Sequence, residues 1–372
     1  MRYSHLRMDL LSTHRATLMN LSELFTIDNM VDAYYSCRQA APWKTEVQKF
    51  GLNLIGNCIA LQNEILTETY RTSTPRQFTI SERGKLRMIE APVFRDRIVH
   101  RILNKEYLLP NIMPYLIHDN GASMKGKGTG FSRSRLEEHL HRYYFEHGSD
   151  GYILLGDVHH YFDSIRQDIL IQMLVNKLPA EDDDIIRLLA YIISSSKYTE
   201  DADGLSLGSE LPQTLAVFYL SPLDNFVKIV KGCKFYGRYM DDFYIISDDK
   251  QMLHNLIYEI NDLLSHVGLR LNDRKTQVVK LRHDFTFLQT KYSLTDTGKI
   301  VKRLTHSKVV RQRRRMKAHG RLYREGIISY DTCYNQYKSW RQSILKSYNA
   351  CYTTIKALDD EYKEIYGEEF KL

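Results

Sequence analysis

Two adjacent aspartates, Asp241 and Asp242, lie between the β-rich apolar segments KFYGRY and FYIIS. This arrangement predicts a β-hairpin that carries both acids at its turn. Two neighbouring carboxylates repel each other unless a cation lies close by, and Mg²⁺ binds carboxylate oxygens together with substrate phosphates. Acidic residues are also ordinary turn formers, so the pair alone leaves a metal site and a plain turn both open.

A third carboxylate favours the metal site. Asp157 ends another apolar run, Tyr152 to Leu155, which reads as a buried strand with an acid at its C-terminal end. Two such strands could place three carboxylates around one point. Sites with two metal ions about 3.5–4 Å apart stabilise both the attacking and the leaving oxygen of an in-line phosphoryl displacement. The chemistry that these residues indicate is therefore nucleotidyl transfer.

The surrounding segments predict a chain of mixed α and β structure that positions these acids. Residues 20–70 have helical periodicity, and residues 75–92 predict a β-hairpin. Helices are also expected on either side of the first acidic strand, and an amphipathic helix at 251–268 is closed by Gly268. The last 65 residues or so read as helical and begin with a basic segment.

Composition agrees with a nucleic-acid enzyme. The 372 residues can bury a sizeable core, and the net charge of +7 suits a polyanionic partner. The five cysteines form no CxxC pair, so the sequence indicates neither a zinc site nor a disulfide framework. We expect a cytoplasmic protein without membrane association, because no signal peptide and no apolar run of about 20 residues is present.

Seven segments, in order along the chain, resemble the motifs of reverse transcriptases, which are RNA-directed DNA polymerases. They are GKLRMIEAPVFRDRIVHRIL, GASMKGKGTGF, GDVHHYFDSI, GLSLGSELPQTLAVFYLSPLDNF, GRYMDDFYIIS, LRLNDRKTQVV and FTFLQTKYSL. GRYMDDFYIIS resembles the catalytic YxDD motif, which is highly specific in this context. The resemblance extends over roughly residues 25 to 305.

The resemblance implies an α+β right-hand polymerase fold with fingers, palm and thumb, an antiparallel palm sheet and a helical thumb. The implied division is an N-terminal helical extension with the start of the fingers at 1–74, fingers at 75–150, palm at 151–292, and helical thumb with C-terminal tail at 293–372. We expect no ribonuclease H, integrase or endonuclease module after residue 305.

The resemblance also implies a set of catalytic and metal-binding positions. The catalytic residues are Asp157, Asp241 and Asp242. Together with Val158 they are the implied positions for two Mg²⁺ ions, for which Mn²⁺ can substitute.

Other positions are implied for the nucleotide, namely Lys85, Arg87, Phe162, Gln213 and Lys275. In the family, the aromatic residue at Phe162 excludes a 2′-hydroxyl, and the lysine at Lys275 lies near the pyrophosphate leaving group, where an ammonium can act as general acid. A core phenylalanine and an ordinary loop lysine are the alternatives.

Two basic segments are candidates for nucleic-acid binding. Lys125 and Lys127 lie in a glycine-rich loop, where missing side chains let the backbone approach a phosphate. A basic run supplies the remaining candidates, Arg311, Arg313, Arg314 and Arg315. A flexible surface loop and a solvated helix face are the respective alternatives.

The segments DRIVHRIL, YFDSI and PQTLAVFYLSPLDNFV resemble bacterial enzymes, closest to those of diversity-generating retroelements and antiphage defence. Diversity-generating enzymes typically carry Ser-Gln where this chain has Pro212-Gln213, so we favour a primer-extending enzyme of a bacterial or phage antiphage-defence system or a domesticated retroelement. The expected partners are a template RNA, a primer, dNTPs, and an accessory protein or second copy.

Three alternatives stay open for the function. The first is a diversity-generating enzyme that acts with an accessory protein. The second is a protein-primed or untemplated DNA polymerase, for which the tail supplies several tyrosine hydroxyls: Tyr330, Tyr334, Tyr337, Tyr348 and Tyr352. The third is an RNA-binding protein with a polymerase-like fold and no activity.

Overall fold

The computed structural model describes residues 19–39, 41–82, 85–195, 204–206 and 208–367. The chain forms two compact units, each assembled from separate segments. The first contains residues 1–125, 158–232 and 259–271, and the second contains residues 126–157, 233–258 and 272–372. No helix among the described residues is long and apolar enough to cross a membrane. The four-part division at 74, 150 and 292 stays a prediction.

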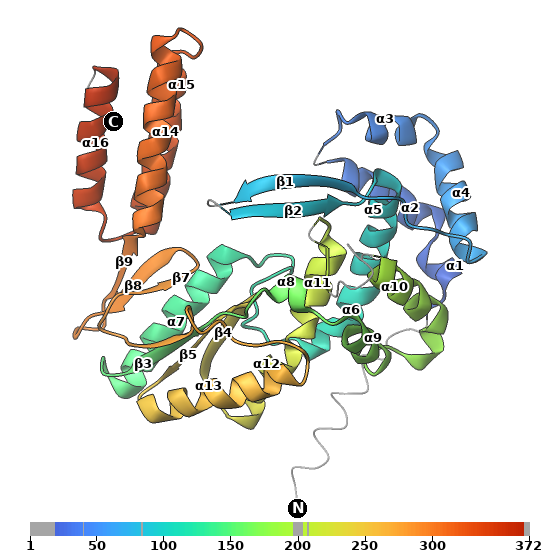
Figure 1. Ribbon diagram of the computed structural model, residues 1–372, viewed down its shortest axis with the longest axis horizontal. Helices are drawn as coiled ribbons and strands as arrows, with labels where there is room; N and C mark the ends of the chain where they lie inside the picture. Colours follow the sequence, from blue (N-terminus) through green and yellow to red (C-terminus); the bar gives the residue numbers. More distant parts are fainter. Residues whose placement is uncertain (1–18, 40, 83–84, 196–203, 207, 368–372) are drawn as a thin grey trace, which may run out of the picture. The chain divides into compact units, whose positions relative to one another are not determined.

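The first unit is mainly helical and carries one antiparallel hairpin (Figure 1). The hairpin pairs β1 (Arg76–Glu82) with β2 (Lys85–Ala91), which confirms the hairpin expected at 75–92. The helical segments of this unit are α1 (Leu21–Leu24), α2 (Ile27–Arg38), α3 (Thr45–Leu52), α4 (Leu54–Leu66), α5 (Phe94–Ile102), η1 (Leu103–Leu108), α6 (Leu109–Ile112), η2 (Met113–Tyr115), α8 (Tyr161–Ser164), α9 (Gln167–Val175), η3 (Ala180–Asp182), α10 (Asp183–Ser195), α11 (Glu210–Tyr219), α12 (Ser221–Asn225) and η4 (Phe226–Val230).

A buried carboxylate ties the approach to the hairpin to helix α5. Asp96 is 1% exposed and accepts hydrogen bonds from the Tyr70 hydroxyl at 2.9 Å and from the Ser73 amide at 2.8 Å. Next to it, Arg95 forms an ion pair with Glu64 of α4. These contacts give the buried Asp96 carboxylate its partners and pair the charge of Arg95, so both residues have structural roles.

The second unit contains a four-stranded antiparallel sheet in the order β4-β5-β3-β6. Its strands are β3 (Tyr152–Gly156), β4 (Phe235–Tyr239), β5 (Asp242–Ser247) and β6 (Gln277–Lys280). Gly156 pairs with Phe243, and a Cβ at position 156 would lie 2.1 Å from the Phe243 ring. Glycine at the end of β3 therefore lets an aromatic residue pack directly beside the strand end that carries the first acid.

One face of this sheet is covered by a helix and a second sheet. Residues Ile153, Leu155, Tyr244 and Ile246 share that face by register and form a core with α7 (Thr129–His147) and the sheet β7-β8-β9. The strands of the second sheet are β7 (Phe285–Phe287), β8 (Thr290–Leu294) and β9 (Ile300–Leu304). The same face continues to the aspartates at the strand ends, so the core fixes the site.

Three helices complete the second unit, α14 (His306–Arg324), α15 (Tyr330–Ser347) and α16 (Tyr352–Tyr366), as Figure 1 shows in orange and red. Met316 and Gly320 are buried one turn apart on α14, and Tyr337 and Tyr362 stack with ring centroids 5.0 Å apart. The helical C-terminal region is confirmed. The remaining helix, α13 (Lys250–Ser265), contributes to both units and is followed by Gly268 at φ +72°, close to the predicted end.

Candidate active site

The acids lie at the ends of neighbouring strands. β3 ends at Gly156 and Asp157 follows it, 5% exposed, whereas Asp242 begins β5. Because Gly156 pairs with Phe243 in the antiparallel register, the next step along the two strands brings Asp157 opposite Asp242. Tyr239 pairs with Asp242, so Met240 and Asp241 form the two-residue turn between β4 and β5. The predicted hairpin and acid-bearing strand are therefore confirmed.

A buried arginine supports this turn. Met240 has φ +56°, a backbone region that two-residue hairpin turns use but that glycine or asparagine usually occupies. Arg238, on β4, is 0% exposed, and one of its guanidinium nitrogens donates to the Met240 carbonyl at 2.9 Å. The hydrogen bond holds the strained residue in place, and with it the two acids that follow.

The electrostatics of the site work against three ionised carboxylates. Burial, with the negative charges of Asp241 and Asp157, raises the pKa of Asp242 to about 7, while the charge of Lys275 opposes the rise. A bound cation relieves repulsion of this kind, and a set of oxygen donors is what Mg²⁺ takes. By charge and donor type, these residues fit the two ions implied by the sequence.

Asp157 is held by two polar side chains from the loop before β6. The Lys275 ammonium lies 2.5 Å from Asp157 Oδ2, and Asn272 Nδ2 donates to Oδ1 at 3.0 Å. Burial alone would lower the pKa of Lys275, but the hydrogen bond to Asp157 and the charges of the three acids raise it above its ordinary value. Among the described residues, no three His, Cys, Asp or Glu side chains are grouped as a metal-holding cluster.

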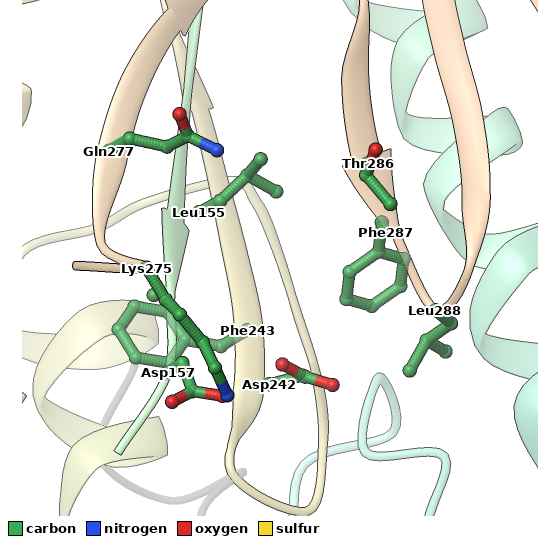
Figure 2. A pocket seen from close by; sticks show the side chains of 10 residues that line it. Leu155, Asp157, Asp242, Phe243, Lys275, Gln277, Thr286, Phe287 and Leu288 are labelled. Carbon is green, nitrogen blue, oxygen red and sulfur yellow. The ribbon is translucent and has the colours of Figure 1, made fainter. Parts of the chain in front are cut away.

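A small cavity adjoins the acids. It has a volume of about 70 Å³ and runs from Asp157, Asp242 and Lys275 toward the β7–β8 hairpin. Figure 2 shows the tip of the Lys275 side chain beside Asp157, with Gln277 and Thr286 on opposite walls farther along. Its other lining residues are Leu155, Gly156, Phe243, Phe287 and Leu288. The cavity therefore has a charged end at Asp157, Asp242 and Lys275 and a mixed polar and apolar lining beyond it.

The other predicted nucleotide-binding residues lie in the first unit. Phe162 is half-buried on α8, and Gln213 is the exposed residue within the otherwise buried stretch 211–220 of the described chain. Lys85 and Arg87 belong to β2, and their side chains lie outside the described residues. Val158 is buried and forms an isolated antiparallel bridge with Leu271.

The glycine-rich loop has room for a ligand backbone. Lys125 is exposed, and the Lys127 ammonium lies 5.0 Å from the centre of the Phe131 ring. A Cβ added at Gly126, Gly128 or Gly130 would have no atom within 4 Å. Packing therefore does not require these glycines, although the φ of +77° favours glycine at Gly126. The open space is consistent with a loop that approaches another molecule.

The basic run on α14 divides into two environments. Arg311, Arg314 and Arg315 are exposed at helical spacings that place them on one face. Arg313 is half-buried and forms an ion pair with Glu361 of α16 at 2.6 Å. Three of the four predicted arginines thus present their charge outward, and the fourth links two helices.

The tail tyrosines differ in accessibility. Tyr337 and Tyr348 are buried, and the Tyr337 hydroxyl donates to Asp359 at 2.7 Å. Tyr352, at the start of α16, is 80% exposed. Tyr330 and Tyr334 are half-buried, so Tyr352 is the most exposed of the tyrosines considered as protein primers.

Asn272 and Arg238 are the residues of this site that sequence reasoning missed. An asparagine three residues before Lys275 carried a weak signal, because it begins the turn of a segment already assigned to the site. Arg238 carried none, since a charged residue in a short strand usually faces solvent.

Comparison with known proteins identifies the matching family. The model of the family described as reverse transcriptase (RNA-dependent DNA polymerase) matches residues 70–292. The search of curated proteins found no match.

Two solved structures also resemble the chain. Apo telomerase from Candida tropicalis, truncated from the C-terminal domain, is 14% identical with a TM-score of 0.45, over 66% of this chain and 59% of that one. Telomerase from Candida albicans, in complex with a fragment of telomeric RNA, is 14% identical with a TM-score of 0.46, over 79% of this chain and 59% of that one. The chain thus spans 59% of each.

Proposed function

Because the chain belongs to the reverse transcriptase (RNA-dependent DNA polymerase) family, we propose that it extends a primer on an RNA template by nucleotidyl transfer at Asp157, Asp241 and Asp242. The observation that carries this proposal is the convergence of these acids at neighbouring strand ends. The raised pKa of Asp242 is its electrostatic consequence. Three carboxylates that cannot all ionise without a nearby positive charge are suited to binding cations, and through them a triphosphate.

Two Mg²⁺ ions, or Mn²⁺ in their place, would be held by the three aspartates with the Val158 position. When bound, they would lower the pKa of the primer 3′-hydroxyl and neutralise charge on the triphosphate. In this scheme Asp242 would act as an ionised carboxylate. The Lys275 ammonium, which contacts Asp157 Oδ2 here, would protonate the departing pyrophosphate oxygen.

The remaining residues bind and select the substrates in this proposal. The half-buried Phe162 would exclude a 2′-hydroxyl, and the exposed Gln213 would contact the incoming nucleotide, with Lys85 and Arg87 on its triphosphate. Nucleic-acid backbones would be contacted by a further set of basic residues: Lys125, Lys127, Arg311, Arg314 and Arg315. Such contacts are independent of sequence and sensitive to salt.

For the biological role we propose antiphage defence or a domesticated retroelement, because Pro212-Gln213 departs from the Ser-Gln typical of diversity-generating enzymes. Host cells that express the wild-type chain with its native flanking genes should resist phage, and cells with Asp241→Asn should not. Equal plaque numbers for both, together with a matching template repeat and variable gene in the flanking sequence, would favour diversification instead.

Template dependence tests the activity itself. The purified protein is given a primed RNA of defined sequence and one dNTP at a time, and its products are resolved with and without protease digestion. The proposal predicts incorporation of the complementary dNTP only, on a product that migrates as free DNA. Addition that ignores the template, or DNA that stays linked to protein until digestion, would replace it with the untemplated or protein-primed alternative. In the latter case Tyr352→Phe is the first variant to test.

A further inference from the structure

We infer that Asn272 is a positioning residue for the nucleotidyl-transfer site, where it fixes the orientation of the Asp157 carboxylate and the place of Lys275. This inference rests on the function proposed above. Asn272 holds Asp157 at two points. Its backbone N–H donates to the Asp157 carbonyl at 2.8 Å, and its side-chain Nδ2 donates to Asp157 Oδ1 at 3.0 Å.

The two contacts restrict different parts of Asp157. The backbone bond fixes the main chain just after β3, beside the antiparallel bridge between Val158 and Leu271. The side-chain bond fixes the carboxylate, whose oxygens would otherwise be free to rotate about the last side-chain torsion. Because Asp157 is almost fully buried, a carboxylate oxygen without a partner would also be costly there.

Asn272 also organises the turn that carries Lys275. Its carbonyl accepts the backbone N–H groups of Lys275 at 3.0 Å and Thr276 at 2.8 Å, and its side-chain oxygen accepts the N–H of Arg274 at 3.2 Å. The turn then enters β6, which pairs with β3 from Gln277 onward. Lys275 is thereby directed back to Asp157 Oδ2, so one short turn provides a partner for each carboxylate oxygen.

The two partners differ in what happens when a cation binds. The Lys275 ammonium is itself a cation and competes for Asp157 Oδ2. The Asn272 carboxamide is neutral, so it can keep Oδ1 while Oδ2 changes partner. Asn272 therefore keeps the Asp157 carboxylate in the same orientation while the partner of Oδ2 changes from Lys275 to a metal ion. Residues that orient a metal ligand in this way typically change metal affinity or activity by about 10–100-fold when they are removed.

The test compares Asn272→Ala with a matched control, Asn261→Ala. Asn261 Oδ1 accepts the N–H of Leu271 at 2.9 Å, so its side chain also binds this segment, but at the residue before Asn272. Asn272→Gln keeps the carboxamide on a longer side chain and serves as the conservative variant. The readouts are Mn²⁺ binding by electron paramagnetic resonance without nucleic acid, single-turnover incorporation against Mn²⁺ concentration, and thermal unfolding in chelator.

For Asn272→Ala we expect Mn²⁺ binding about 10–100-fold weaker than wild type. We also expect an incorporation rate that recovers as Mn²⁺ is raised, and a KM for dNTP that changes little. Asn272→Gln should recover part of the affinity, and Asn261→Ala should bind Mn²⁺ like wild type. If Asn272 had only a structural role, Asn272→Ala would lower the unfolding temperature, and excess Mn²⁺ would not restore the incorporation rate.

Two results would overturn the inference, and they are distinguishable. If wild type binds Mn²⁺ and extends the primer, and Asn272→Ala matches the Asn261→Ala control in Mn²⁺ affinity, only the role of Asn272 fails. If Asn272→Ala does not fold, Asn272→Gln decides. The role is also refuted if Asn272→Gln has the same Mn²⁺ affinity as wild type and its incorporation rate does not depend on the metal concentration. If wild type binds no Mn²⁺ and extends no primer, the proposed function fails as well.

Discussion

Replacing Asp242 with asparagine should stabilise the metal-free protein at neutral and alkaline pH. The side chain keeps its size but can no longer ionise beside Asp241 and Asp157, whose charges and the surrounding burial raise the pKa of Asp242 to about 7. In the unfolded chain the carboxyl ionises near its ordinary value of 3.8. The folded wild type therefore binds a proton that the unfolded chain has already lost, and its stability falls as pH rises from about 4 through about 7.

The size of the effect follows from the pKa difference. At about 1.36 kcal/mol per pH unit, the interval from 3.8 to about 7 corresponds to a ceiling of about 4 kcal/mol. Asp242 is partly exposed, so solvent screening reduces the expected gain to about 1–3 kcal/mol at about pH 8. The gain should shrink toward zero below about pH 3, where the wild-type carboxyl is mostly protonated in both states.

Urea unfolding in chelator at several pH values measures this difference. Asp273→Asn is the control, because it removes an exposed carboxylate from the loop that carries Lys275. Added Mg²⁺ should reverse the order, since binding to the folded wild type stabilises it and the variant lacks a ligand. A variant that is no more stable than wild type at about pH 8 in chelator, or a gain independent of pH, would refute the electrostatic account of the site.

Three further predictions concern other residues. Phe162→Ala should raise ribonucleotide relative to deoxynucleotide incorporation in single-nucleotide extension, and an unchanged ratio in a folded variant would make Phe162 a packing residue. Replacing Arg311 and Arg314 with Gln should weaken template–primer binding for any sequence and reduce the slope of log affinity against log salt by about 0.7–0.9 per lost contact. Arg313→Gln, which breaks an ion pair between two helices, should leave that slope unchanged. A slope equal to that of Arg313→Gln after replacement of Arg311 and Arg314 would contradict the assignment. Arg238→Met should lower the free energy of unfolding in urea by about 1.5–3 kcal/mol and reduce the incorporation rate, because a charge-assisted hydrogen bond to the turn is lost. A wild-type free energy of unfolding and a wild-type rate would show that the turn does not need this hydrogen bond.

Local patterns were sufficient to predict the elements that carry the acids. An apolar run that ends in an aspartate predicts a strand and its end, and the pair Asp241-Asp242 between two β-rich segments predicts a hairpin turn. The turn itself is Met240-Asp241, because Asp242 already begins β5. These features depend on residues close together in the sequence. The α+β fold is observed as predicted, and membership of the reverse transcriptase family is confirmed by the match over residues 70–292. The assignment of individual site residues stays a prediction.

The partners of the polar side chains were not predictable in the same way. Asn272 and Asp157 are 115 residues apart and meet only because β6 pairs with β3 in one register. Arg238 is buried because its guanidinium finds a turn carbonyl two residues on, which a pattern of charged and apolar residues does not reveal. The division of the arginine run likewise depends on where α16 presents Glu361 to α14.

Single-turnover incorporation of one dNTP on a primed RNA template tests the central claim most directly. Wild type is compared with Asp157→Asn, Asp241→Asn and Asp242→Asn in Mg²⁺, with binding of the template–primer measured for each. The account predicts that wild type extends the primer, and that each substitution lowers the rate by orders of magnitude while template–primer binding and the fold persist. Near-wild-type incorporation by any of the three would contradict the assignment of nucleotidyl transfer to these carboxylates.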